Sequence, residues 1–173
     1  DFGSMDETTQ ESLTRWIKRG TFSEDEYATE LKDLEDGLGF SPLTGQIVAI
    51  GVLDAERERA AVYYQPNDAD DGDFEEGACK YEALSEADML QKFWDIATKY
   101  DVFVTFNGRS LHLWTRAFGI ESPKAQGVTG DDVRGLFKEG KYREIARYNA
   151  RDLWATLELY RRYQDFFVFP DER

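Results

Sequence analysis

The carboxylate of Asp152 stands among apolar and aromatic side chains near the end of the chain. Residues three and four positions apart share one face of a helix, and the neighbours of Asp152 on that face are Ile145, Tyr148, Ala155, Leu159 and Tyr163. Burying a lone carboxylate costs several kcal/mol unless it is paired or binds a metal. Asp152 is therefore a candidate metal ligand, with the phenol of Tyr148 one turn before it. The alternative is a structural role, in which Asp152 pairs with an arginine or caps a neighbouring element.

Basic residues surround these two candidates, although the chain has a net charge of −14. Between Arg134 and Arg162 there are eight basic and four acidic residues, and Arg147 and Arg151 directly precede Tyr148 and Asp152. Both arginines are candidates for binding phosphate. The alternative is a solvated helix surface with ion pairs four residues apart. The overall charge argues against a protein that coats nucleic acid nonspecifically.

The composition restricts the metal and the compartment. The chain has one cysteine, Cys79, and one histidine, His112, so a structural zinc site is not expected. A metal would be bound by oxygen, which favours Mg²⁺ or Mn²⁺. A single cysteine forms no internal disulfide, as is typical of a cytoplasmic protein. The sequence has no run of eighteen apolar residues and no signal-peptide pattern, so neither a membrane span nor a membrane partner is expected.

Apolar runs that alternate with helical patterns predict an α/β fold with a mixed sheet. Residues 47–53 have the pattern of a buried strand, with 60–64 as its hairpin partner. Residues 102–106 predict a second buried strand that runs into Asn107 and Gly108. Further expectations are one or two helices in 6–36, broken near Gly20 with Ser23 as an N-cap, and a helix from Ser85 to about Tyr100. We also expect a final helix over 142–163 and a solvated loop over 67–77. The length of 173 residues is that of one domain, spanning 1–173.

Four stretches of the chain together resemble one group of nucleases. Residues 148–160, YNARDLWATLELY, resemble the third exonuclease motif of DEDD nucleases, in which a tyrosine precedes an aspartate by four positions. The other three stretches are 41–51 (SPLTGQIVAIG), 106–110 (FNGRS) and 116–124 (RAFGIESPK). In this order they are similar to predicted 3′→5′ exonucleases related to the proofreading domain of family B DNA polymerases.

The resemblance implies a ribonuclease H-like fold, with a mixed sheet flanked by helices, and hydrolysis of phosphodiester bonds at nucleic-acid 3′ ends. The expected substrate is a single-stranded or frayed 3′ end of DNA, and RNA stays open because the sequence does not show contacts to the 2′-hydroxyl. In that family four carboxylates bind two divalent metal ions. By resemblance, Asp152 would be a catalytic metal ligand and Tyr148 would position the attacking water. Phe106, Asn107 and Gly108 would lie along the substrate groove, where a glycine lets the backbone approach a nucleotide closely.

The other three family carboxylates have no clear counterpart. The family's first motif, an Asp-x-Glu on an apolar strand, comes before the region that matches the first residues of this chain. Asp33-Leu34-Glu35 has the same spacing but lies in a polar helical pattern, so we interpret it as a coincidence. The second motif continues from FNGRS into phenylalanine and aspartate. Here either His112 occupies the position of that acid, or a family segment is absent between Ser110 and Leu111.

Two other functions remain open at this point. A nuclease-like fold without catalysis could bind nucleic acid or protein as an interaction module, and the unplaced acids favour this alternative. A small-molecule phosphohydrolase is the other, and it would not distinguish the two ends of an oligonucleotide. The sequence gives no indication of the oligomeric state.

Overall fold

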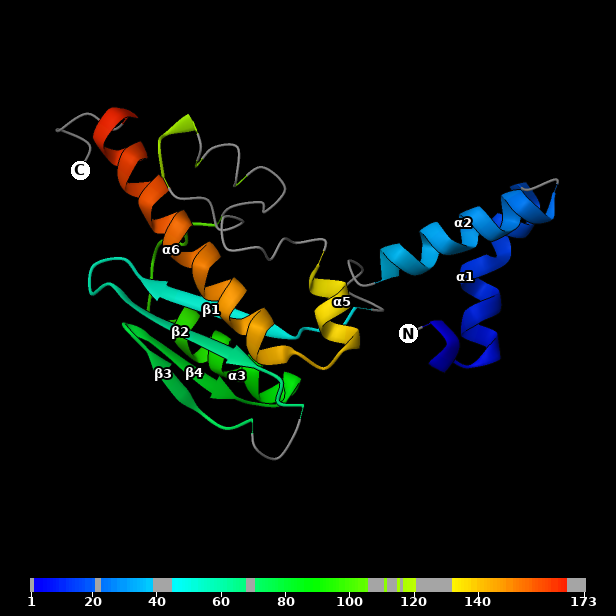
Figure 1. The fold of residues 1–173 in the computed structure, drawn as a ribbon, viewed down its shortest axis with the longest axis horizontal. Coiled ribbons are helices and arrows are strands. Elements are labelled where there is room, and N and C mark those ends of the chain that lie inside the picture. Colours follow the sequence, from blue (N-terminus) through cyan, green and yellow to red (C-terminus); the bar gives the residue numbers. More distant parts are fainter. Residues whose placement is uncertain are drawn as a thin grey trace. The chain divides into compact units, whose positions relative to one another are not determined.

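The computed structural model of the protein describes residues 2–20, 23–38, 45–67, 71–105, 111, 115, 117–120 and 132–167. The chain divides into two compact units, Asp1–Gln46 and Ile47–Arg173, which Figure 1 colours from blue to red along the sequence. That residues 1–173 form one domain stays a prediction. None of the described helices combines the length and the apolar composition that are needed to cross a membrane.

The first unit is a helical hairpin. A 3₁₀ turn, η1 (Phe2–Ser4), precedes α1 (Glu7–Gly20) and α2 (Glu24–Gly37). The break that the sequence predicts near Gly20 is confirmed, and Ser23 caps the second helix. The Ser23 hydroxyl accepts a hydrogen bond from the N–H of Glu26 at 3.2 Å, and the Glu26 carboxylate accepts one from the N–H of Ser23. This capping box satisfies donors that the first turn of a helix leaves unpaired.

The second unit is built on a four-stranded mixed sheet with the strand order β1-β2-β4-β3. Strands β1 (Ala49–Asp54) and β2 (Arg59–Tyr64) form an antiparallel hairpin, as predicted. Strands β3 (Phe74–Glu76) and β4 (Cys79–Ala83) form a second hairpin, and β4 pairs with β2 in parallel. The predicted α/β class with a mixed sheet is therefore confirmed, and β1 and β3 are the two edge strands of the described sheet.

Two local predictions are wrong. The segment 67–77 is not a loop throughout, because Phe74 begins β3 and stacks on Tyr81 of β4 with ring centroids 4.2 Å apart. The buried strand expected over 102–106 does not form in its described part. Residues 102–105 have no strand structure, and the Val102 side chain is 74% exposed. An apolar strand is stable only when a neighbouring strand pairs with its backbone, and in the described sheet the only strand paired with β1 is β2.

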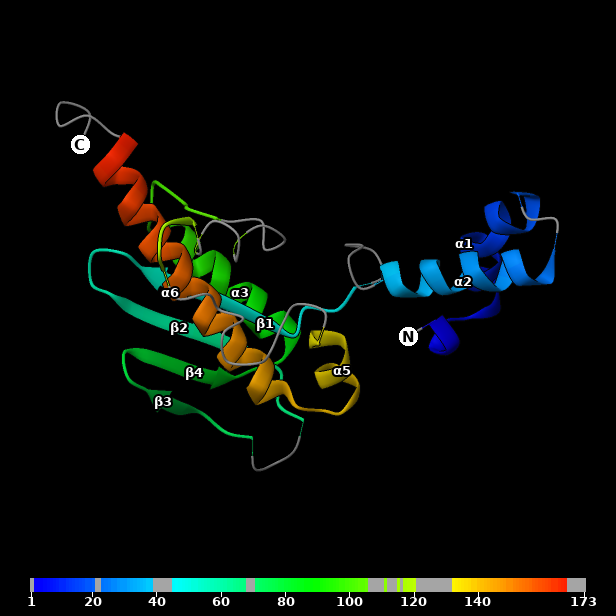
Figure 2. The same ribbon diagram turned by 45° about the horizontal axis from the view of Figure 1, so that its top comes forward.

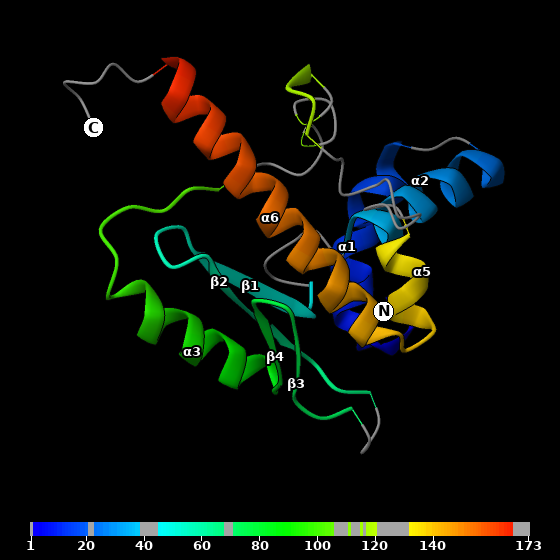
Figure 3. The ribbon, with the colours of Figure 1, turned by 60° about the vertical axis from the view of Figure 1, so that its left-hand side comes forward.

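Helices cover the two faces of the sheet. Helix α6 (Tyr142–Phe167) and helix α3 (Glu86–Ala97) both contact β1 and β2, and they lie on opposite sides of the strands (Figures 2 and 3). Because side chains alternate along a strand, one set of residues packs under α6 and the other under α3. The α6 side contains the main core of this unit, made of Ala60, Val62, Tyr64, Cys79, Tyr81, Ala146 and Ala150.

The α3 face contains charged groups as well as apolar ones. Met89 of α3 is fully buried, and the Lys92 ammonium lies 5.3 Å from the centre of the Tyr63 ring. Lys92 also forms an ion pair with Glu82 of β4. The helix begins at the predicted cap, since the Ser85 hydroxyl accepts the N–H of Asp88 at 3.2 Å. It ends at Ala97, three residues before the predicted end.

A glycine turn connects α5 (Val133–Lys138) to α6. Gly140 has a φ of 70°, and its N–H donates a hydrogen bond to the Phe137 carbonyl. The N–H of Lys141 donates to the Leu136 carbonyl at 2.8 Å. This pair of bonds is the Schellman arrangement, which needs a left-handed residue that glycine provides without steric cost. Helix α6 then begins at Tyr142, as predicted, and continues four residues beyond Tyr163.

Candidate functional site

Helix α6 carries the candidate residues and packs closely on the sheet. Ala146 and Ala150 are buried against β2 and β4, and their small side chains allow a short distance between helix and strands. Gly51 of β1 also allows α6 and the sheet to lie close together, because a Cβ built there would lie 2.0 Å from Asn149 Oδ1 and 2.7 Å from Leu153 Cδ1. Asn149 and Gly51 thus fix the position of α6 over β1, a role that the sequence analysis did not assign to either residue.

The apolar stripe predicted around Asp152 is present over most of its length. Ile145, Ala155 and Leu159 are buried, and Ala155 and Leu159 pack with Leu111 in a second small core. Phe118 and Ile120 border this cluster. Tyr163 departs from the prediction, since its side chain is 54% exposed.

Tyr148 and Asp152 are both half-buried on this stripe. The Asp152 carboxylate therefore lies among apolar neighbours without being sealed from water. Residues four apart on a helix have Cβ atoms about 5–6 Å apart, so the phenol and the carboxylate can reach one small ligand. The Arg151 guanidinium lies 5.7 Å from the centre of the Tyr148 ring, within the range of a cation–π contact. This contact helps to orient the phenol.

Arg147 lies on a different side of α6. Its Nε and Nη2 atoms both donate to Glu76 Oε1 of β3, at 2.9 and 2.7 Å, and its guanidinium lies 5.2 Å from the Phe74 ring. Arg143, one turn earlier, forms an ion pair with Asp71 at 3.0 Å. Both arginines bind the β3 edge of the sheet. Phosphate binding by Arg147 stays a prediction, and the phosphate would have to compete with Glu76.

The positions of these arginines show which way the Asp152 side of the helix faces. Each residue of an α-helix turns the chain by about 100°, so Arg147 and Asp152 lie about 140° apart around the axis of α6. The side with Arg147 reaches β3, and β1 is at the opposite edge of the sheet. The side with Asp152 is therefore directed toward the β1 edge.

No metal site is complete within the described residues. Among them, no three histidine, cysteine, aspartate or glutamate side chains lie close enough together to hold one ion. The Asp33-Leu34-Glu35 sequence lies in helix α2 of the first unit, as its polar pattern predicts. Cys79 is buried, and burial raises the pKa of its thiol. His112 lies outside the described residues, as do Phe106, Asn107 and Gly108, so the predicted substrate groove is untested.

Arg143 and Glu76 are further residues that sequence reasoning missed. Arg143 donates from Nε to the Tyr64 hydroxyl at 3.3 Å and from Nη2 to the Gly72 carbonyl at 3.2 Å. The four-residue spacing of Arg143 and Arg147 is visible in the sequence, but their partners lie 71 residues or more away along the chain.

Comparisons of the chain with protein-family models, with curated proteins and with solved structures give no match. The features of this site therefore rest on the residues of the chain itself.

Proposed function

We propose that this chain is part of a 3′→5′ exonuclease with a ribonuclease H-like fold, which hydrolyses phosphodiester bonds at single-stranded or frayed 3′ ends, with DNA as the preferred substrate. The observation that carries the proposal is the half-buried Asp152 carboxylate, one turn from Tyr148 on the otherwise apolar side of α6. A carboxylate at this position can accept hydrogen bonds from water and can bind a cation. A phenol beside it adds a hydrogen-bond donor for a water molecule or a phosphate oxygen.

Roles for the nearby residues follow from their chemistry. Asp152 accepts a proton or a hydrogen bond from a bound water, and the Tyr148 hydroxyl holds the same water in position. Arg151, which contacts the Tyr148 ring, supplies a positive charge for a substrate phosphate. Arg147 contributes less, because Glu76 already occupies its guanidinium.

The metals implied by the resemblance, Mg²⁺ or Mn²⁺, do not fit the described residues alone. Four carboxylates would hold two ions, and the described residues contain no group of three histidine, cysteine, aspartate or glutamate side chains that could hold one. We therefore assign no step to a metal ion. The proposal requires further carboxylates, and the geometry limits where they can be. In the described sheet β1 is an edge strand. A strand paired with its outer edge would lie on the Asp152 side of α6, so acids on such a strand could face Asp152.

The test uses the full-length protein, Mn²⁺ and a single-stranded oligonucleotide with a 5′ fluorophore. A ladder of products that shorten stepwise from the 3′ end supports the exonuclease, and a blocked 3′ end should stop it. Asp152→Asn should abolish cleavage, and Tyr148→Phe should slow it at least about tenfold. The matched control is Glu144→Gln, which makes the same chemical change at an exposed position of α6. Normal cleavage by a folded Asp152→Asn variant would reject the proposal.

The second candidate is a catalytically inactive nuclease-like module that binds nucleic acid or protein. It is favoured by the unplaced family carboxylates, since no three potential metal ligands lie together among the described residues. Binding of the oligonucleotide without shortening, in both Mg²⁺ and Mn²⁺, supports this candidate over the enzyme. Cleavage of a simple phosphate ester without preference for either end of an oligonucleotide would instead indicate a phosphohydrolase.

A further inference from the structure

Helix α1 has a side that its partner helix leaves uncovered. Thr14 and Ile17 are the buried residues of α1. At about 100° per residue, the opposite side carries Thr8, Ser12, Arg15, Trp16 and Arg19. We call these five residues the α1 outer face. The face lies within the first unit and is separate from the α6 site.

This face is positively charged in an acidic protein. It contains two arginines and no acidic residue, although the chain as a whole carries −14. Within the described residues, neither Arg15 nor Arg19 forms an ion pair, although other arginines do so with Glu76, Asp71, Glu58 and Asp54. Lys18 and the exposed Glu11 border the face and line an adjoining depression with Arg15 and Arg19, and Lys18 likewise forms no ion pair among the described residues. With both bordering residues counted, the net charge of this region is about +2, which favours an anionic ligand.

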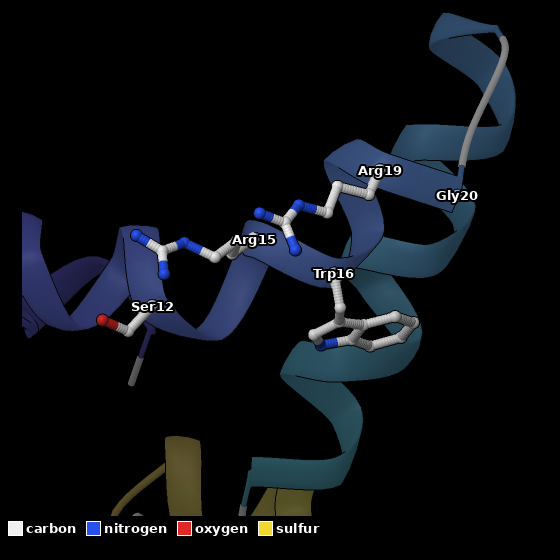
Figure 4. Close-up of a pocket in the computed structure, with 5 residues that line it drawn as sticks. All are labelled: Ser12, Arg15, Trp16, Arg19 and Gly20. Atoms are coloured by element: carbon white, nitrogen blue, oxygen red, sulfur yellow. The ribbon is translucent and has the colours of Figure 1, made fainter.

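An exposed aromatic ring adjoins these cations. Trp16 is 56% exposed, whereas an indole usually finds a buried place because of its large apolar area. Figure 4 shows the Arg15 and Arg19 side chains extending in the same direction along α1, while the Trp16 indole projects from another side of the helix. Together with Ser12 and Gly20 they line a shallow depression of about 380 Å³. Gly20 follows Trp16 by one turn and has no side chain, so it leaves the adjacent side of the indole open.

We infer that the α1 outer face binds single-stranded nucleic acid, with a base stacked on Trp16 and phosphates held by Arg15 and Arg19. Exposed aromatic rings flanked by cations bind single strands in this way, because every base has a face that can stack and every linkage has a charge. An acidic polypeptide would satisfy the arginines but would not need the indole. The inference depends on the proposed function only for the class of ligand.

Binding is measured with the full chain in EDTA, so that cleavage cannot contribute. The probe is a 5′-fluorescein-labelled twelve-residue oligothymidylate, followed by fluorescence anisotropy over a series of salt concentrations. Trp16→Ala should weaken binding at least about fivefold, the lower end of what one stacked base contributes. Trp16→Phe should retain most of the affinity, because a phenyl ring also stacks.

The double variant Arg15→Gln/Arg19→Gln should reduce the slope of log affinity against log salt by about 1.4, since each phosphate contact with a single strand contributes about 0.7. The matched control, Lys32→Gln/Lys99→Gln, removes the same charge at exposed positions elsewhere and should leave the slope unchanged. Circular dichroism verifies that each variant is folded.

Three results would overturn the inference: no binding by the unaltered chain, equal effects of the control pair and the arginine pair, or full affinity in folded Trp16→Ala. Displacement of the oligonucleotide by polyglutamate of equal length at equal concentration would also overturn it, and would indicate an acidic polypeptide as the ligand. The exonuclease proposal is judged separately by cleavage in Asp152→Asn. If cleavage by Asp152→Asn rejects the exonuclease proposal, the binding result for the α1 outer face still stands. If the binding test fails, the exonuclease proposal still stands.

Discussion

Substituting Gly51 by alanine tests the packing that positions the candidate site. The new Cβ would lie 2.0 Å from Asn149 Oδ1 and 2.7 Å from Leu153 Cδ1, both shorter than any van der Waals contact. Asn149 Oδ1 is buried and has no hydrogen-bond partner among the described residues. The Asn149 amide is therefore held in place by packing. In Gly51→Ala this amide must move, or α6 must move away from β1.

The expected effect is the difference between two terms. Overpacking a well-packed contact costs about 1–3 kcal/mol. Replacing glycine by alanine lowers the entropy of the unfolded chain and stabilises by about 0.4–1 kcal/mol. Gly51→Ala should therefore lower the free energy of unfolding by about 1 kcal/mol. In the Asn149→Ala variant the atom closest to the new Cβ is absent, and Leu153 can move into the space. Gly51→Ala should therefore raise the free energy of unfolding of this variant by about 0.5 kcal/mol.

The assay is urea unfolding of the four proteins in this double-mutant cycle, followed by circular dichroism. The expected interaction energy between the two positions is about 1.5 kcal/mol, within the range seen for residues in contact. Gly135→Ala in α5 is the control, because a Cβ there meets no atom within 4 Å, and it should not destabilise. If Gly51→Ala costs the same with and without the Asn149 side chain, our account of how α6 packs on β1 is wrong.

Three other changes have clear expected outcomes. Gly140→Ala should destabilise by about 1–2 kcal/mol, because the φ of 70° is costly for any residue with a Cβ; the urea midpoint should fall without a change in slope. Ser85→Ala should cost about 1 kcal/mol through loss of the α3 cap, and hydrogen exchange should be faster in the first turn of α3 only. Hydrogen bonds from the Arg57 N–H and the Tyr100 hydroxyl lower the pKa of Asp54 to about 2 from its ordinary value of 3.8. Because the folded pKa is the lower one, this carboxylate stabilises the fold above about pH 4, and the contribution is lost as the pH falls through about 2. NMR titration should show the Asp54 pKa rising in Tyr100→Phe, and an unchanged pKa would contradict the assignment.

Local patterns in the sequence were sufficient for much of the fold. The capping residues Ser23 and Ser85 begin helices at the predicted positions because a cap depends only on residues within one turn. The hairpin of β1 and β2 and the start of α6 also follow from short-range patterns. The apolar side of α6 around Asp152 was visible as well, since helical periodicity alone determines which residues share a side.

Long-range pairing was not visible in the sequence. Phe74 became a strand residue because Tyr81 offered a stacking partner, and residues 102–105 did not because no described strand pairs with them. Arg147 remains a predicted phosphate ligand, and its position beside Glu76 was visible in the tertiary structure alone. Periodicity and capping act over a few residues, so helices α2, α3 and α6, the β1–β2 hairpin and the side of α6 that holds Asp152 could be predicted from local patterns. Strand order, the partner of each arginine and the direction in which Asp152 faces depend on contacts between segments far apart in the chain, so they became visible in the fold alone.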